Sequence, residues 1–269
     1  MSGTWYRRRG TRRTAAVGWA AVVVLQLAAP GPGWGHFGAI IPSDDMVSGT
    51  EERTLGLTVA FLHPFGDTYM EMERPVQFGV LLRGQKQSLL EDLSSADAPG
   101  GGTTWSAEYR IQRPGDHVFY CEPAPYYEPS EGLFIIHYSK VVVHAMGMEV
   151  GWDSEVGLKT EIVPLTRPYG LWSGNVFQGV VKLKGAPVPG AGVEVAFHNT
   201  DGIAAPDEGY AIQVVKADAN GVFTYAMPRA GWWGFSALST DDRRLVGPDG
   251  RECQVEIGAV LWVKTRDMK

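Results

Sequence analysis

Hydrophobic and polar residues alternate along several short segments of this 269-residue chain. The segments LGLTVAFLHPF (55–65) and VQFGVLLRG (76–84) show this alternation and end at proline or glycine. LFIIHYSKVVVHAM (133–146) is rich in β-branched residues, and QVEIGAVLWVK (254–264) continues the pattern near the end of the chain. Successive side chains of a strand point to opposite faces, and β-branched residues favour strands. Each segment therefore predicts a β-strand, with 133–146 as one long strand or two.

Turn-forming residues separate the predicted strands. A Pro-Gly turn lies between WSAEYRI (105–111) and the strand ending in HVFYCEP (117–123), which predicts a β-hairpin. Only a single helical turn is expected within 89–105, ahead of a glycine-rich loop. We therefore predict an all-β protein of two antiparallel β-sandwich-like domains, at residues 36–160 and 161–269.

The second predicted domain carries two stretches that resemble small modules of known fold. GAPVPGAGVEV (185–195) and ADANGVF (217–223) are similar to transthyretin-like or carboxypeptidase-regulatory-like modules. This resemblance implies a fold and leaves function open, because such folds serve many functions.

The first 35 residues have the layout of a secretory signal peptide. Five arginines precede an apolar run from Ala15 to Ala29, and Gly33-Trp34-Gly35 forms a small-x-small cleavage site. The run is short for a membrane span, which needs about 20 residues. We expect an exported, periplasmic or otherwise extracytoplasmic protein, with an uncleaved N-terminal tether as the alternative.

Charge argues against nucleic acid as a partner. The formal net charge is −6, and loss of residues 1–35 would leave 19 basic and 30 acidic residues, a net charge of −11. Nucleic-acid binding requires a basic footprint. An acidic protein is compatible with a cation as ligand.

Motifs for enzymatic catalysis are missing from the sequence. GxSxG, HExxH and P-loop patterns do not occur. The two cysteines, Cys121 and Cys253, have neither CxxC nor zinc-ribbon spacing, and one disulfide or two free thiols are both open. No enzyme is predicted, although a redox-active metal site would leave that question open.

Histidine distribution is the main functional signal. Five of the six histidines precede residue 150. His36 would become the first residue after cleavage at Gly35, and its α-amine and imidazole could then chelate one metal ion together. His63 precedes Pro64 at a strand end, which holds its backbone extended. His137, near the proline- and tyrosine-rich segment 122–132, completes the predicted metal ligands His36, His63 and His137.

The other histidines are expected to be structural. His144 lies seven residues from His137, so the two would face opposite sides of one unbroken strand. His117 is expected in a turn and His198 facing solvent. Met70 and Met72 would suit soft copper, but core packing is the favoured interpretation. Nearby carboxylates are Glu71, Glu73, Glu128 and Glu131.

Four stretches of the chain resemble one family of exported bacterial proteins. They are FLHPFGDTYMEMERPVQFGV, YYEPSEGLFIIHYSKVVV, the block from Gly151 to Asn199, and DANGVFTYAMPRAGWWGFSAL. The family consists of domains of unknown function described as periplasmic components of nickel transport complexes (NikK/NikM-associated). The resemblance implies capture of Ni²⁺ or Co²⁺ and delivery to an energy-coupling-factor type membrane transporter. Ligation by the three histidines is inferred from their chemistry.

Two alternatives remain open from the sequence. One is an adhesion or assembly module without metal, whose aromatic stretches bind a partner. The other is a copper protein in which the His36 amine and imidazole act with a second histidine. Copper and zinc thus remain alternatives to nickel and cobalt, and the sequence leaves the oligomeric state undetermined.

Overall fold

The computed structural model describes Met1, residues 35–49 and residues 53–268. The predicted signal peptide thus lies outside the described residues, apart from Met1 and Gly35. In the described part of the chain, no helix is both long and apolar enough to cross a membrane.

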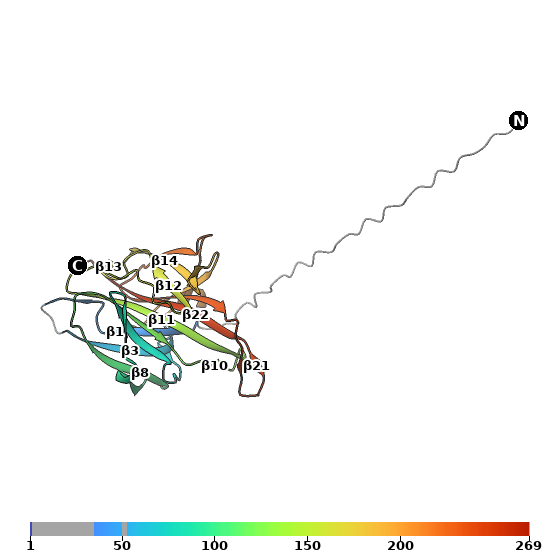
Figure 1. Cartoon of the computed structure of the whole chain (residues 1–269), viewed down its shortest axis with the longest axis horizontal. Helices are drawn as coiled ribbons and strands as arrows, with labels where there is room; N and C mark the ends of the chain where they lie inside the picture. Colours follow the sequence, from blue (N-terminus) through green and yellow to red (C-terminus); the bar gives the residue numbers. More distant parts are fainter. Residues whose placement is uncertain (2–34, 50–52, 269) are drawn as a thin grey trace. The chain divides into compact units, whose positions relative to one another are not determined.

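The fold is all-β, as predicted, and is built from stacked sheets (Figure 1). The longest sheet has the order β17 (Ile212–Lys216), β16 (Gly192–Phe197), β19 (Gly231–Thr240), β22 (Val255–Arg266), β11 (Leu133–Ala145), β9 (Gly115–Glu122), β5 (Gln77–Leu82) and β6 (Gln85–Ser88). Short strands β2 (Met46–Val47) and β10 (Tyr126–Glu128) pair with β11, and β13 (Leu171–Trp172) pairs with β22. We call this the central sheet.

Two smaller sheets pack on the central sheet. One, the N-terminal sheet, contains β1 (Phe37–Pro42), β3 (Thr54–His63), β8 (Thr103–Arg110) and β7 (Ser94–Asp97), with β4 (Thr68–Tyr69) beside β3. The other contains β12 (Thr160–Pro164), β14 (Val176–Leu183) and β15 (Ala186–Pro187), with β18 (Val222–Ala226) beside β14. The remaining elements are the pair β20 (Leu245–Val246) and β21 (Glu252–Cys253), η1 (Leu90–Asp92) and α1 (Glu208–Ala211).

Strand β11 is one unbroken strand that is buried on both faces. Every residue from Ile135 to Ala145 is buried. Ile135, Val141 and Val143 pack in the core shared with the N-terminal sheet, whereas Ile136 and Val142 pack in a core on the opposite face. Burial on both sides explains why this strand is a nearly continuous apolar run.

The predicted hairpin across Pro114 and Gly115 is wrong. Strand β8 pairs with β3 and β7, whereas β9 pairs with β5 and β11, so the two strands belong to different sheets. Gly115 has φ of +131°, which L-residues rarely adopt. A Pro-Gly turn reverses the chain, but here the reversal carries it from one sheet to the next.

The two halves of the chain share the central sheet. Strand β11 pairs in parallel with β22, from Phe134 beside Val255 to Val141 beside Trp262. The predicted division of the chain into two domains at residue 160 stays a prediction. The hydrogen-bonded sheet itself continues from one half into the other.

Both cysteines are buried free thiols. Burial raises the pKa of the Cys121 thiol well above its usual range. Of the two possibilities left open by the sequence, the structure therefore has two separate thiols.

Candidate functional site

His36 and His63 lie side by side at one end of the N-terminal sheet. His36 directly precedes β1, and His63 is the last residue of β3. Antiparallel pairing places Phe37 opposite Leu62, which brings the flanking histidines together. Their ring centroids are 4.5 Å apart.

His137 reaches the same region from the central sheet. Its Nδ1 accepts a hydrogen bond from the Gly38 amide of β1 at 3.3 Å. The pKa of His36 is lowered in part by both His63 and His137, which places all three imidazoles within electrostatic range of one another. The structure therefore gathers the three predicted ligands in one region, from three different strands or strand ends.

Two glycines provide the space that the His137 ring occupies. A Cβ atom added at Gly258 of β22 would lie 2.5 Å from His137 Cδ2 and 2.7 Å from Nε2. A Cβ atom at Gly38 would lie 2.9 Å from His137 Cβ and 2.5 Å from Ser139 Oγ. Any side chain at either position would have to displace its neighbours, so both glycines are required for this packing.

Glutamates from separate segments surround the histidines. Glu128 Oε2 lies 3.3 Å from His36 Nε2, and Glu256 Oε1 lies 3.8 Å from His137 Nε2. The other Glu128 oxygen, Oε1, accepts hydrogen bonds from the amide and hydroxyl of Ser130, at 3.0 and 2.6 Å. The Glu128 carboxylate is therefore held in place beside the histidine pair.

Two further glutamates extend the negative charge around the site. Burial raises the pKa of Glu131, helped by repulsion from Glu256 and Glu128. Burial also raises the pKa of Glu194 to about 7, helped by Glu256 and Glu131. Mutual repulsion of this kind is relieved when a cation enters the group.

His36 is electrically neutral at physiological pH. Burial, followed by the neighbouring His63 and His137, lowers its pKa to about 4, against the weaker opposing effect of Glu128. Only a neutral imidazole offers a nitrogen lone pair to a metal. A cation could therefore bind His36 at neutral pH without first displacing a proton from the ring.

Hydrogen bonds set the expected tautomers of the other two rings. His63 Nδ1 lies 3.3 Å from the Gly35 carbonyl and can only donate to it, which leaves the lone pair on Nε2. His137 Nδ1 accepts from Gly38, so its proton lies on Nε2. Coordination through His137 Nε2 would require the ring to change tautomer, so His36 and His63 are better prepared for a metal.

His137 Nε2 is nevertheless a buried polar atom that makes no hydrogen bond. The His137 residue lines a cleft of about 200 Å³ together with Met72, Phe61 and Tyr126. The Phe61 ring contacts both His36 and His137, with centroid distances of 5.4 and 5.6 Å. His36 and His137 thus pack against one shared aromatic ring.

The donor atoms do not yet converge on one point. Within residues 35–49 and 53–268, no group of three His, Cys, Asp or Glu side chains is arranged to hold a metal ion. Closing a coordination sphere here would require side-chain rotation, chiefly of His63, because the packing at Gly38 and Gly258 confines the His137 ring and Ser130 holds the Glu128 carboxylate. Met72 is buried in the core and Met70 packs against it, in agreement with the core interpretation of the methionines.

The remaining histidines lie outside the cluster. His144 faces away from His137, as expected, and its Nδ1 contacts Asp116 Oδ1 at 2.8 Å. The placement of His117 in a turn is wrong, because it is fully buried in β9. The placement of His198 in solvent is also wrong, because its side chain is 9% exposed and contacts Asp67. Both errors arise because a local sequence pattern does not reveal which sheet covers a residue.

Sequence reasoning missed the glutamates contributed by the second half of the chain. Glu256 is brought to the site by the parallel register that places Gly258 beside His137. Glu194 lies on β16, and a Cβ atom at Gly35 would lie 2.7 Å from its Oε2. No local signal marks either residue, because each depends on strand pairing across more than 100 residues.

Comparisons with solved structures give only weak likenesses. α2-Macroglobulin from Escherichia coli is 13% identical, with a TM-score of 0.27 over 87% of this chain and 16% of that protein. The adhesin InvE from Yersinia pseudotuberculosis is 11% identical, with a TM-score of 0.25 over 82% of this chain and 58% of that one. PorU from Porphyromonas gingivalis is 10% identical, with a TM-score of 0.25 over 86% and 20%. The chain thus spans less than two thirds of each, and these likenesses carry no argument about function.

The comparison with protein families, in contrast, identifies a family for this chain. A search of curated proteins finds no match to the chain. One family model, however, matches residues 33–241, which include the three histidines and most of the central sheet. The chain therefore belongs to the family described as Domain of unknown function (DUF4198).

Proposed function

We propose that this protein captures Ni²⁺ or Co²⁺ outside the cytoplasm and delivers the ion to an energy-coupling-factor type membrane transporter. The observation that carries this proposal is the gathering of His36, His63 and His137 within a group of glutamates. Imidazole and carboxylate are donors that suit these borderline ions. The ion is cargo here, and the delivery step rests on the resemblance noted from the sequence.

The incomplete convergence of the donors agrees with a capture role. A carrier must release its ion, and a site that closes by side-chain rotation can also reopen. His36 is already neutral at physiological pH, and Glu128 is already positioned 3.3 Å from it. These two residues with His63 form the proposed primary ligands, and His137 joins them after a change of tautomer.

Cleavage after Gly35 would change this site in a specific way. It would remove the carbonyl that lies 3.3 Å from His63 Nδ1 and would create an α-amine on His36. The new amine would belong to the residue whose ring already lies beside His63, with the two ring centroids 4.5 Å apart. Cleavage would therefore add one nitrogen ligand and release His63 from one hydrogen-bonding partner.

The first test is intact-mass analysis and calorimetric titration of protein purified from an exporting host. Metal-stripped protein would be titrated with Ni²⁺, Co²⁺, Cu²⁺ and Zn²⁺ at pH 7.5. We expect a mass that begins at His36 and about one Ni²⁺ or Co²⁺ per chain. His36→Ala or His63→Ala should weaken binding at least tenfold, because each removes a ligand from the small set that the site offers.

His198→Gln is the matched control, since it removes a histidine whose side chain lies outside the cluster. Equal loss of affinity in this control would show that the ion binds elsewhere or without specificity. Unchanged affinity in both cluster variants would overturn the proposal. Stoichiometric binding of Cu²⁺ alone would favour the copper alternative, in which the His36 amine and imidazole act with His63.

A further inference from the structure

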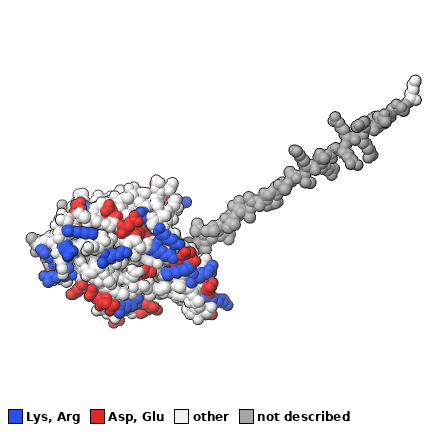
Figure 2. Space-filling model, in the orientation of Figure 1, with Lys and Arg blue, Asp and Glu red and all other residues white. Residues whose placement is uncertain are grey.

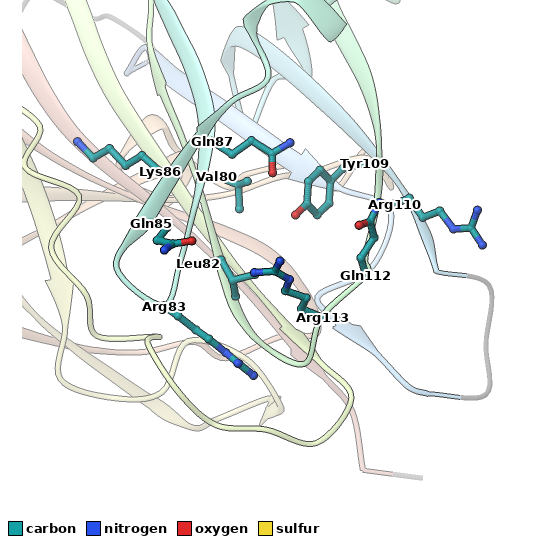
Figure 3. Close-up of a pocket in the computed structure, with 10 residues that line it drawn as sticks. All are labelled: Val80, Leu82, Arg83, Gln85, Lys86, Gln87, Tyr109, Arg110, Gln112 and Arg113. Carbon is teal, nitrogen blue, oxygen red and sulfur yellow. The ribbon is translucent and has the colours of Figure 1, made fainter.

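A second cavity lies at the opposite end of the N-terminal sheet from the histidines. It has a volume of about 450 Å³ and lies between the β5–β6 hairpin and the segment that follows β8 (Figure 3). Strand β3 separates the two sites, because Thr54 pairs with Arg110 at one end while His63 stands at the other. Ten residues of extended strand correspond to about 30 Å, so the two sites are independent.

Four basic residues line this cavity, and none of the described residues that line it is acidic. They are Arg83, Lys86, Arg110 and Arg113. This concentration is unusual in a chain with a formal net charge of −6. On the face of the molecule in Figure 2, by comparison, basic and acidic side chains are interspersed.

In the described part of the chain, these four cations also have no carboxylate partners. Among the residues that the structure describes, none of the four forms an ion pair, whereas Arg74, Arg167, Arg229 and Arg266 all do. All four cations are exposed. In Figure 3, Arg113 reaches into the cavity, whereas Lys86 and Arg110 point outward from its edge. Lys86 Nζ lies 5.6 Å from the centroid of the Tyr120 ring. Unpaired positive charges focused in a concave surface produce a potential that attracts anions.

Polar groups inside the cavity add hydrogen-bonding capacity. In Figure 3, the Arg113 side chain reaches across toward Leu82, and Tyr109 and Gln87 point toward the same space. The Tyr109 ring is held by Phe119 and His117, at centroid distances of 5.2 and 5.7 Å. Its hydroxyl is therefore fixed by packing on the core, which reduces the entropy lost when a ligand binds.

Arg83 is held at the edge of the cavity by its own contacts. Its guanidinium donates hydrogen bonds to the Pro114 carbonyl at 2.8 Å and to Met148 Sδ at 2.9 Å. Its backbone has φ of +50°, in the left-handed region that non-glycine residues rarely adopt. Lys86 lies on the edge strand β6, where a lysine also discourages pairing with other chains. That role does not account for Arg113 or Arg83.

We propose that this cavity binds a compact polyanion, a small molecule that carries two or more phosphate, sulfate or carboxylate groups. Arg113 would bind one oxyanion group with Tyr109 and Gln87. Arg83 would meet a second charged group at the edge of the cavity, and the exposed Lys86 and Arg110 nearby would add to the positive potential. Arginine offers paired donors that match oxyanion geometry, and the cavity volume is in the range of small-molecule sites.

The test is calorimetric titration of the whole metal-free protein with tripolyphosphate, and separately with citrate, at pH 7.5 and low salt. We expect one site per chain for at least one probe, with weaker binding of orthophosphate and a dissociation constant that rises with added NaCl. Arg113→Gln should raise the dissociation constant at least tenfold. Arg113→Lys keeps the charge but loses the paired donors, so it should retain part of the affinity.

Arg251→Gln provides the matched control, because it removes the same charge at an exposed position outside the cavity. Its dissociation constant should change less than twofold. An equal loss in both variants would show that net charge alone is responsible and would overturn the proposal. Absence of saturable binding at millimolar concentrations of both probes would also overturn it.

A third arm distinguishes a soluble ligand from a lipid surface. Sedimentation with phosphatidylglycerol vesicles would reveal binding to anionic headgroups. Vesicle binding without binding of either soluble probe would overturn the proposal of a small ligand. Thermal unfolding of each variant would verify that the substituted, exposed side chains leave the fold intact. Failure of metal binding at the histidines would not affect any of these outcomes.

Discussion

Replacing Gly258 with alanine tests whether the close packing around His137 is as tight as the structure indicates. The added Cβ would lie 2.5 Å from His137 Cδ2, a contact that would force a shift. The ring cannot retreat easily, because β11 and β22 are joined by a parallel ladder from Phe134 to Val141 and the side chain is buried. The substitution therefore adds one methyl group to a space that has no room for it.

The expected cost follows from overpacking in a rigid core. Extra methyl groups in well-packed interiors destabilise by about 1–3 kcal/mol. Alanine also restricts the unfolded chain, which stabilises by about 0.4–1 kcal/mol where the backbone tolerates it. Gly192→Ala isolates that second effect, because a Cβ at Gly192, also on a strand of the central sheet, would meet nothing within 4 Å.

Urea unfolding of metal-free protein would measure the difference between the two variants. We expect Gly258→Ala to be less stable than Gly192→Ala by about 1–3 kcal/mol. Introducing Gly258→Ala into a His137→Ala background should remove most of this cost, because the clashing ring is gone. Equal stability of the two alanine variants, or an unchanged cost without the His137 ring, would refute the packing argument.

Two further predictions concern charged groups. Lys140 and Glu161 form a buried ion pair at 2.7 Å, and the Glu161 carboxylate also accepts hydrogen bonds from the amides of residues 156 and 157. Lys140→Met would leave this buried carboxylate without its cation, so it should destabilise the protein by about 3–5 kcal/mol. The double variant with Glu161→Gln should recover part of that loss in urea unfolding; additive losses would contradict the coupling. In folded, metal-free protein the pKa of His36 is lowered to about 4, so as pH falls below 6.5 the unfolded chain gains a proton at this residue before the folded chain does. The free energy of unfolding should therefore fall by up to about 3 kcal/mol by pH 4. The raised pKa of Glu194, about 7, acts oppositely, since its contribution is present below pH 4.5 and is lost as pH rises through 7. Urea unfolding between pH 4 and 8 should therefore show that His36→Gln loses less stability than the parent protein as pH falls, and that Glu194→Gln loses less as pH rises toward 7. Stability profiles identical to that of the parent would contradict both pKa shifts.

Local sequence patterns were sufficient to identify the strands but not their partners. The β-branched run at 133–146 predicts a strand, and β11 spans Leu133–Ala145. Period-two alternation also places His137 and His144 on opposite faces, as observed: His137 packs on Phe61 of one core and His144 on Tyr169 of the other. The hairpin prediction at Pro114-Gly115 failed because turn chemistry reports a reversal of direction without specifying the sheet that receives the next strand.

The candidate site was predictable to the extent that its residues lie at strand ends. His63 before Pro64 marks the end of β3, and His36 precedes the first strand of the described fold. Their proximity then follows from antiparallel pairing of neighbouring strands. The need for glycine at position 258 could not be inferred, because it arises only when β22 lies in parallel register beside β11.

The parallel register of β22 beside β11 makes the candidate site depend on both halves of the chain. Five of the six histidines lie before residue 150, which suggests a site contained in the first half of the chain. Yet Gly258 provides the space for His137, and Glu256 and Glu194 add negative charge from strands β22 and β16. The core on that face also includes Trp262, whose indole donates a hydrogen bond to the Gly38 carbonyl beside the site. A fragment that ends at residue 160 would keep the three clustered histidines but would lose the packing and charges that position them. The proposed capture function therefore belongs to the chain as a whole, because the central sheet assembles the site from both halves.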